Sequence, residues 1–407
     1  MHGKTLRRSA LDADPVAFPL SPARRDDARA FYAERRARSP LGRVRLPSGH
    51  DAVLVVKYAD VAAALADARL SHELAAPGSP RFVAGPSILD SSNGMLNKDG
   101  PEHLRFRRLL AAAFTPRAVE RRLPLIQDIA TELIDDLERA GAPADLVDGF
   151  CFALPVRVIC RLLGVPERDA ARFRAWSQAF IGMKSFDDAR LALILEFVEY
   201  AKALIARRRE EPGEDLIDDL IAARDGQDRL SEDELVRSVI GLVAVGNEST
   251  SNALSRCVPT LLRDGRMLWR RLLDRPDLVP AAVDELLRCA QAGNGLLRTA
   301  VEDVDLPSGT IRKGDAVVLA LESAAFDEEA YPEPESVIFD RDAPRLIVFG
   351  DGAHYCLGVS LAKAELAIGI STLLDRLPGL HLAADPRTLR YTDGEMISSL
   401  IELPVGW

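Results

Sequence analysis

A glycine-rich segment near the C-terminal end presents a single cysteine, Cys356, immediately before an apolar run with helical spacing. Gly350, Gly352 and Gly358 lie beside it, and a glycine lets the backbone approach a flat ligand because no Cβ stands in the way. Unpaired amides at the start of the predicted helix should lower the pKa of the thiol and donate to the sulfur. Since the thiolate is the form that binds a metal, we expect Cys356 to be a metal ligand, although a lone cysteine is more often a buried structural thiol.

A second cluster of small and polar residues interrupts the apolar pattern of a long predicted helix, at Gly246, Glu248, Ser249 and Thr250. Gly246 removes a side chain at a point where a ligand could approach. The Ser249 hydroxyl can donate to the carbonyl of Val245 and bend the helix, which would open a groove beside it. Taken alone, the cluster is more typical of a helix kink or a packing site than of catalysis.

The ten residues from Phe349 to Gly358 resemble the haem-ligand loop of the cytochrome P450 family. Phenylalanine, glycine, histidine, cysteine and glycine occupy every expected place, which a chance match would rarely reproduce. The resemblance implies haem b (iron protoporphyrin IX), with its iron held by the Cys356 thiolate as the axial ligand. Electron donation from such a thiolate favours cleavage of the O–O bond.

Beside such a loop, the polar cluster on the long helix resembles the family's oxygen-activation motif. The resemblance implies that an acid and an alcohol deliver protons, with Glu248 as the acid, Ser249 as the alcohol and Thr250 beside them in the catalytic group. Ser249 stands where threonine is commoner, and it lacks the methyl group that fixes the rotamer, so reduction could be coupled less tightly to product formation. Val245 stands where alanine or glycine is usual and is expected to narrow the pocket.

A haem carries two carboxylates, and burying them without cationic partners would cost several kcal/mol. The resemblance implies that four basic residues bind them: His103 and Arg107 on one predicted helix, Arg298, and His354 just before the ligand. Any one of these side chains could instead be a surface charge. Their occurrence together at matching positions favours the haem interpretation.

Glu285 and Arg288 have a spacing that usually gives a solvated surface pair contributing only about 0.2–0.5 kcal/mol. Their position ahead of the cysteine loop resembles the family's buried Glu-x-x-Arg element, which a later arginine completes. Arg341 fits that role best, and Arg345 is the alternative. We expect these charged residues to stabilise the haem loop rather than to take part in catalysis.

The composition indicates one mainly α-helical domain. The chain has 407 residues, 47% of them hydrophobic and 6% aromatic, and no Gly/Ser-rich or Pro-rich linker divides it. Residues 1–407 are therefore predicted to form a single domain, in which abundant Ala, Leu and Arg favour helix. The resemblance implies that this domain is a haem-binding monooxygenase with a cytochrome P450-like fold, mainly α with a small β region and with a long central helix across the haem.

Hydrophobic periodicity places the main elements along the chain. The long helix should begin at the capping box of Ser231 and Glu234 and end near Leu262, and a small antiparallel sheet is expected between Thr299 and Leu321. Further helices are expected over 61–69, 101–113, 117–140, 154–163, 167–180 and 189–209, from Pro280 onwards and after Cys356, with a strand over 51–56.

The net charge of −10 argues against non-specific binding to nucleic acid, because lysine and arginine are not in excess. No apolar stretch reaches the length of a membrane span. Five scattered cysteines indicate a reducing compartment. A cytoplasmic protein with neither a nucleic-acid nor a membrane partner is expected.

No flavin or iron–sulfur signature accompanies the P450-like landmarks, so electrons are expected from an external NAD(P)H-dependent reductase and ferredoxin. A basic segment, more often just a solvated helix face, is a candidate docking face for an acidic ferredoxin-type partner. Its members are Arg105, Arg108, Arg117, Arg121 and Arg122.

These interpretations predict a haem-thiolate monooxygenase that inserts one oxygen atom from O2 into a small-to-medium organic substrate, by hydroxylation or epoxidation, in specialised metabolism. Oxidative C–C or C–O coupling or ring closure at the same haem is the alternative within the enzyme class. A non-catalytic haem-based binding or sensor protein is the alternative outside it. The expected pocket walls, at 75–96, 177–188, 293–297 and 393–398, contain no recognisable motif, so the sequence does not predict the substrate.

Overall fold

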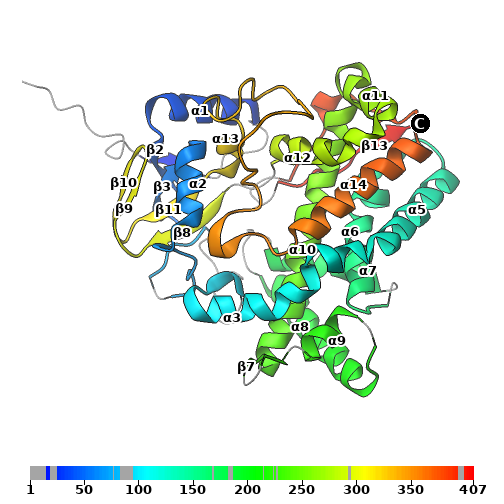
Figure 1. Ribbon diagram of the computed structural model, residues 1–407, viewed down its shortest axis with the longest axis horizontal. Helices are drawn as coiled ribbons and strands as arrows, with labels where there is room; N and C mark the ends of the chain where they lie inside the picture. Colours follow the sequence, from blue (N-terminus) through cyan, green and yellow to red (C-terminus); the bar gives the residue numbers. More distant parts are fainter. Residues whose placement is uncertain are drawn as a thin grey trace, which may run out of the picture.

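One helix of 31 residues, α10 (Glu232–Leu262), forms the centre of the helical part of the molecule (Figure 1). The Ser231 hydroxyl accepts a hydrogen bond from the Glu234 amide, and the Glu234 carboxylate accepts one from the Ser231 amide. The predicted capping box is therefore present, and the predicted end at Leu262 is confirmed as well. At a rise of about 1.5 Å per residue, a helix of this length reaches across most of the molecule.

The computed structural model describes residues 15–18, 25–76, 78–82, 95–166, 169–181, 187–213, 215–222, 224–225, 228–291, 295–392 and 398–407. Within them, the predicted mainly α fold with a small β region is confirmed. The other helices are α1 (Arg25–Arg38), α2 (Tyr58–Ala66), α3 (Gly100–Ala111), α4 (Pro116–Glu120), α5 (Leu123–Ala140), α6 (Ala153–Leu162), α7 (Ala170–Ile181), α8 (Asp188–Glu210), α9 (Leu216–Ala222), α11 (Met267–Asp274), α12 (Val279–Cys289), α13 (Leu321–Ala325) and α14 (Val359–Arg376). Single 3-10 turns occupy Met95–Asn97, Ala112–Phe114, Asp264–Arg266, Pro276–Leu278, Gly352–His354 and Pro386–Thr388, and a π-helix occupies Val147–Cys151.

Helices α6, α7, α8 and α14 pack directly on α10. The approach of α14 depends on Gly369, where a Cβ would lie 3.2 Å from a methyl carbon of Leu154 in α6 and 3.5 Å from one of Leu254 in α10. A larger side chain at Gly369 would push the three helices apart. Because α14 directly follows Cys356, this packing fixes the position of the cysteine loop relative to α10.

The main sheet has six strands in the order β1-β2-β3-β11-β8-β4 and lies on the side of the molecule away from α5 and α14 (Figure 1). Its strands are β1 (Val16–Ala17), β2 (Leu41–Arg45), β3 (Asp51–Val55), β4 (Leu70–Ser71), β8 (Leu296–Ala300) and β11 (Ala316–Leu319). The predicted antiparallel pairing between Thr299 and Leu321 is confirmed, because β11 pairs antiparallel with β8 and β10 pairs antiparallel with β9. Outside that range, β11 also pairs parallel with β3. The smaller pairings join β9 (Val304–Leu306) to β10 (Gly309–Ile311), β5 (Ala144–Asp145) and β12 (His381–Leu382) to β13 (Pro404–Gly406), and β6 (Arg224–Asp225) to β7 (Asp228–Arg229).

Strand β3 is buried on both faces, which explains its unbroken apolar run. Val53 and Val55 pack in a hydrophobic cluster with Val61 of α2, whereas Ala52 and Leu54 pack in a second cluster on the opposite face. Successive side chains of a strand point to opposite faces, so a strand covered on both sides needs apolar residues at every position.

The predicted single helix over 117–140 is wrong, because the chain forms α4 and α5 with a break at Arg121 and Arg122. Pro124 stands in the first turn of α5, where its missing amide is tolerated but where an established helix could not pass through it. The other helical predictions agree with the structure to within a few residues at each end.

All five cysteines are unpaired thiols, and four of them are buried. Only Cys356 is partly accessible. None of the described helices combines the length and the apolar character that crossing a membrane requires.

Candidate active site

The cysteine loop between Phe349 and α14 is held in shape by its own backbone. The Cys356 amide donates to the Phe349 carbonyl at 2.8 Å, and Gly350 and Gly352 adopt φ values of 77° and 64°. Residues other than glycine are strained in this left-handed region. A Cβ on Gly352 would also lie 3.1 Å from the Cα of Ala66 in α2, so both glycines serve the backbone and packing of the loop.

Gly358 differs, because nothing in the described protein requires a glycine there. Its φ is −85°, and a Cβ built on it would meet no atom of the described residues within 4 Å. The same holds for Gly246 on α10. Each of these glycines leaves room for a ligand rather than for another part of the chain, which fits the close approach of a flat group such as haem.

The Cys356 thiol does not have the lowered pKa that the sequence predicts. Burial of the sulfur raises its pKa above the usual value, and a hydrogen bond from the Gly358 amide and the positive charge of Arg107 oppose that rise without cancelling it. The predicted effect of the helix start is present, but removing the sulfur from water outweighs it. A bound cation would favour the anion here, because metal coordination releases the thiol proton.

One face of α10 is exposed although the residues on either side of it are buried. Val245 is 38% exposed, and Gly246 and Ser249 are exposed too, whereas Ala244 and Asn247 are buried. Residues three and four apart share one face of a helix, so Val245, Gly246 and Ser249 form a single exposed stripe near the middle of α10. This stripe offers an apolar side chain, a glycine and a hydroxyl to a bound molecule.

The two hydroxyls of the polar cluster bond back to their own helix. Ser249 Oγ donates to the Val245 carbonyl at 3.0 Å, as predicted, and Thr250 Oγ1 donates to the Gly246 carbonyl at 3.1 Å. Helix α10 nevertheless continues without a break through these residues. Thr250 is buried, so of the two hydroxyls only that of Ser249 lies on the exposed stripe.

Glu248 is buried, although the next residue, Ser249, is exposed. Glu248 Oε1 accepts hydrogen bonds from Asn252 Nδ2 at 3.1 Å and from the Ser399 hydroxyl at 3.2 Å. Its Oε2 is buried without a partner among the described residues. Glu248 and Ser249 are therefore neighbours in sequence with different burial and different partners, and Asn252 and Ser399 were not among the predicted site residues. The contact between Glu248 and Asn252 has a local signal, because residues four apart on a helix are neighbours on its surface.

Three imidazoles stack on one another close to the cysteine loop. The ring centre of His354 lies 3.8 Å from that of His103 and 3.4 Å from that of His72, with angles of 17° and 8° between the ring planes. Asp99 accepts from His354 Nε2 at 2.9 Å. These residues and the buried Arg298, whose charge acts on both His72 and Asp99, are called the histidine cluster below. His72 and Asp99 were not among the predicted site residues.

Burial dominates the electrostatics of the histidine cluster. It lowers the pKa of His103 to about 4, helped by the charges of His354 and Arg107, and lowers that of Arg298 to about 9 against the pull of Asp99. It also lowers the pKa of His72 to about 2, with Arg298 and His354 adding to the effect. Burial alone would raise the pKa of Asp99, but hydrogen bonds from its neighbours outweigh it and hold that pKa well below its usual range.

The charges of this region are unbalanced in favour of cations. Arg298 is buried and donates only to its own neighbour's carbonyl, at Leu297, with no ion pair to a carboxylate in the described part of the chain. The positive charge of Arg107 acts on both His103 and Cys356, so Arg107 lies near both. Two arginines face a single carboxylate, Asp99, and the neighbouring neutral imidazoles can donate hydrogen bonds, so the region fits a ligand with two carboxylates, which haem has.

The described residues contain no group of three or more His, Cys, Asp or Glu side chains gathered for a metal ion. An iron bound by Cys356 would therefore take its remaining ligands from elsewhere, as it does in a porphyrin. The residues present thus fit haem on three counts: one partly accessible cysteine, two glycines, Gly246 and Gly358, with open space where a Cβ would stand, and two arginines against a single carboxylate.

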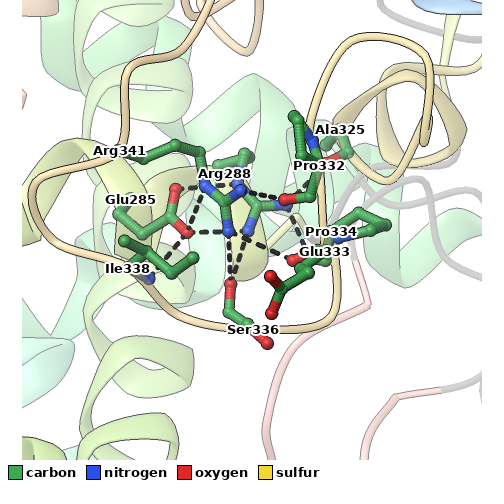
Figure 2. A network of polar contacts seen from close by, with 9 residues as sticks. All are labelled: Glu285, Arg288, Ala325, Pro332, Glu333, Pro334, Ser336, Ile338 and Arg341. Atoms are coloured by element: carbon green, nitrogen blue, oxygen red, sulfur yellow. Dashed lines mark hydrogen bonds and ion pairs between the residues drawn. The ribbon is translucent and has the colours of Figure 1, made fainter.

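A second buried charged cluster, called the Glu285 cluster, joins α12 to the loop that follows α13 (Figure 2). Arg288 donates to both oxygens of Glu285 at 2.8 Å, and Arg341 Nε donates to Oε1 at 3.1 Å. Arg341 is thus the completing arginine, as predicted, whereas Arg345 pairs with Asp351 near the surface. The remaining bonds of the two arginines reach the carbonyls of Ala325, Pro332, Glu333, Pro334 and Ser336, and the Ile338 amide donates to Glu285.

Comparison with known proteins identifies the family. The model described as "Cytochrome P450" matches residues 173–378. Mycinamicin IV hydroxylase/epoxidase from Micromonospora griseorubida is 40% identical, and the match covers 97% of this chain and 99% of that relative. The chain belongs to the cytochrome P450 family. Nocardicin C N-oxygenase from Nocardia uniformis subsp. tsuyamanensis is also 40% identical to this P450, over 99% of this chain and the whole of the relative.

Solved structures share the fold of this P450. The mycinamicin VIII C21 methyl hydroxylase from Micromonospora griseorubida, solved with mycinamicin VIII bound, superimposes with a TM-score of 0.88 at 32% identity, covering 96% of this chain and all of that one. The P450 is an oxidoreductase that uses haem b and electrons from external donors. It inserts one oxygen atom from O2 into an organic substrate by hydroxylation or epoxidation in specialised metabolism. The predicted family, fold, cofactor and enzyme class are confirmed.

The basic segment of this P450 is only partly available to a partner. Arg105 forms an ion pair with Glu234 of α10, and Arg122 donates to the Ala113 carbonyl. The remaining members of the segment, Arg108, Arg117 and Arg121, are exposed. Of the expected pocket walls, residues 77, 83–94, 182–186, 293–294 and 393–397 lie outside the described residues.

Proposed function

We propose that this P450 oxidises a largely apolar specialised metabolite on the side of α10 that carries the exposed stripe. The observation behind the proposal is Val245, an apolar side chain left 38% exposed in the middle of a helix with buried flanks, one turn from Ser249. An apolar surface beside a hydroxyl suits oxidation of a C–H or C=C bond, because it binds hydrocarbon and restrains bulk water. The names of the relatives, which refer to mycinamicin IV and nocardicin C, support specialised metabolism as the source of the substrate.

When bound, haem supplies the iron that activates dioxygen and transfers one of its atoms to the substrate. We assign Cys356 as the axial ligand of that iron. His103, Arg107, Arg298 and His354 are assigned to the two haem carboxylates. The support is the excess of cations around them and the space beside Gly246 and Gly358. In this assignment the chain holds the haem in one orientation and restrains water at the exposed stripe.

Glu248, Ser249 and Thr250 are proposed to deliver protons to the site. Asn252 and Ser399 hold one oxygen of Glu248, while the other has no partner among the described residues. The Ser249 hydroxyl can accept a proton and donate its own, on the side where the substrate binds.

The proton-delivery role is tested with Glu248→Gln. We expect product formation to fall about a hundredfold, in the range typical of a lost general acid, with haem content and substrate affinity unchanged. Steady-state turnover and pyridine haemochrome content measure the two effects. Glu232→Gln, an exposed acid at the start of the same helix, is the matched control and should behave as the wild type. Unchanged turnover in Glu248→Gln would contradict the role.

The reaction type is tested with isotopically labelled dioxygen. A product that gains one labelled oxygen atom is expected, because the enzyme acts as a monooxygenase. A product that instead loses two hydrogens and carries no label would identify oxidative coupling or ring closure as the reaction. Mass spectrometry distinguishes the two outcomes once a substrate has been found by its effect on the haem absorbance.

We also propose that an acidic ferredoxin docks on the exposed arginines of the basic segment. Charge reversal of Arg117 and Arg121 to glutamate should slow ferredoxin-driven reduction several-fold at low salt, because steering by surface charge is lost. Chemical reduction by dithionite should not change. Arg387→Glu, at an exposed arginine outside the segment, is the control. Equal ferredoxin-driven rates in the charge-reversed enzyme, the control and the wild type would place the docking face elsewhere.

The proposed location is the cytoplasm, where a reducing compartment keeps the five thiols unpaired and NAD(P)H-dependent donors are present. We further propose that residues 1–407 act as one haem-binding monooxygenase domain. The relatives at 40% identity support this, because each aligns with nearly the whole chain.

A further inference from the structure

His72 belongs to no motif, yet the sheet brings it to the predicted haem carboxylate site. Strands β4 and β8 pair antiparallel, with Leu70 opposite Ala300 and Ser71 opposite Thr299. Continuing that register by one residue sets His72 beside Arg298. The charge of Arg298 is the second-largest influence on the pKa of His72, after burial, which agrees with this placement.

The His72 ring covers one face of His354 while His103 covers the other. The His72 and His354 rings are nearly parallel, with an angle of 8° between their planes and their centres 3.4 Å apart. A group that binds at the edge of the His354 ring is therefore within reach of the His72 ring edge as well.

Asp99 holds this arrangement without using the His72 ring. Its carboxylate accepts from the His72 backbone amide at 2.8 Å, the Ser71 hydroxyl at 2.6 Å and His354 Nε2 at 2.9 Å. No hydrogen bond joins the ring nitrogens of His72 to another residue in the described ranges. His72 thus has its backbone fixed by Asp99 and its ring nitrogens available for a ligand.

We propose that His72 is a further residue that binds the haem carboxylates, together with the four residues assigned above. Two carboxylates accept up to about eight hydrogen bonds, and His354 already commits Nε2 to Asp99. The His72 ring supplies a donor at the place where Arg298 and His354 meet. The inference rests on the haem of the family and on the assigned carboxylate site, and it is independent of the role of Glu248.

Two substitutions separate a hydrogen bond to the ligand from simple packing. His72→Gln keeps a donor but removes the ring, and His72→Phe keeps a flat ring against His354 but removes the donor. Transfer of haem from the purified holoenzyme to excess apomyoglobin gives the rate of haem loss. We expect the Phe variant to lose haem about tenfold faster than the Gln variant, because a hydrogen bond to a carboxylate is charge-assisted. The Gln variant should stay within about threefold of the wild type.

The controls are His50→Phe and His50→Gln, at an exposed imidazole whose ring bonds to Ser48, and both should lose haem at the wild-type rate. A Phe variant of His72 that loses haem no faster than the Gln variant would overturn the inference. Arg298→Ala should also speed haem loss. If neither Arg298→Ala nor His72→Phe does so, the carboxylate site itself is misassigned, and the inference fails with it. If Arg298→Ala does so alone, only the role of His72 is refuted.

Discussion

The Glu285 cluster and the histidine cluster are both buried and rich in arginine or histidine, yet they differ in how their charges are satisfied. In the Glu285 cluster, both oxygens of the carboxylate bond to arginine, and the arginines also donate to carbonyls of the loop after α13. In the histidine cluster, Arg298 has no carboxylate partner in the described part of the chain. A buried cluster whose charges are all paired within the protein stabilises the fold. A buried cluster with an arginine that lacks a carboxylate partner is suited to bind an anionic ligand.

The difference follows from the cost of burying charge. An ion pair in the interior is tolerated when hydrogen bonds satisfy both partners, and removing one partner leaves an uncompensated charge. The side chains of Arg288 and Glu285 are only 1% and 5% exposed, so water cannot replace a lost partner there. At Arg298 the carboxylate partner must come from a ligand. Replacing Arg298 therefore leaves no buried carboxylate without its partner, and we expect a smaller loss of stability than at Arg288.

The largest expected effect is on the Glu285 cluster. Arg288→Ala should lower the free energy of unfolding by about 3–5 kcal/mol, because Glu285 stays buried without its main partner. Denaturant unfolding measures the loss. Arg345→Ala removes an ion pair whose arginine is 53% exposed and should cost no more than about 1 kcal/mol. If the two variants lose equal stability, the Glu285 cluster does not carry the structural role described here.

The next effect in size concerns Arg298 and tests the other side of the comparison. Arg298→Ala should speed haem loss about 10- to 100-fold while leaving the unfolding midpoint of the protein nearly unchanged. Arg36 is the matched control, because it is equally buried but pairs with Glu328 at 3.0 Å. Arg36→Ala should lower the unfolding midpoint without speeding haem loss from the folded protein. The opposite pattern in the two variants would contradict the distinction between complete and incomplete clusters.

A pH-dependent effect is expected at Glu365 of α14, a buried acid with no ion pair among the described residues. One of its oxygens has no hydrogen-bond partner among those residues, and burial raises its pKa to about 8, so it stays protonated at neutral pH. Because the folded pKa is above the unfolded value, its contribution to stability is full below pH 4.5 and is lost as the pH rises towards 8.

Glu365→Gln should remove that pH dependence. The difference in unfolding free energy between variant and wild type should grow in favour of the variant by up to about 1.4 kcal/mol per pH unit across this range. Unfolding measured at pH 5, 6, 7 and 8 gives the slope. Parallel stability curves for the two proteins would show that Glu365 titrates normally.

Local signals made much of the fold predictable. The capping box at Ser231, the helical periodicity and the cysteine loop each depend on residues within a few positions of one another. The parallel pairing of β3 with β11 was not predictable in this way, because it joins segments more than 250 residues apart. The break before α5 has a local signal in Pro124, because proline is tolerated in the first turn of a helix but not in its interior.

The site was predictable where a motif carried it and not where tertiary contacts did. Arg341 was preferred to Arg345 from its place in the family pattern, and the structure agrees. His72 reaches the histidine cluster through strand register, and Ser399 reaches Glu248 from the C-terminal segment, so neither has a local signal. The pKa of Cys356 was misjudged because the sequence shows the helix start but not the burial of the sulfur.

The most direct test of the central claim, that Cys356 holds a haem next to the histidine cluster, is the absorbance of the reduced protein with carbon monoxide. A strongly red-shifted Soret band is predicted, because a thiolate ligand produces it. Cys356→Ser should lose that shift while still binding porphyrin. A folded, haem-loaded wild-type protein whose carbon monoxide complex lacks the red shift would contradict the claim.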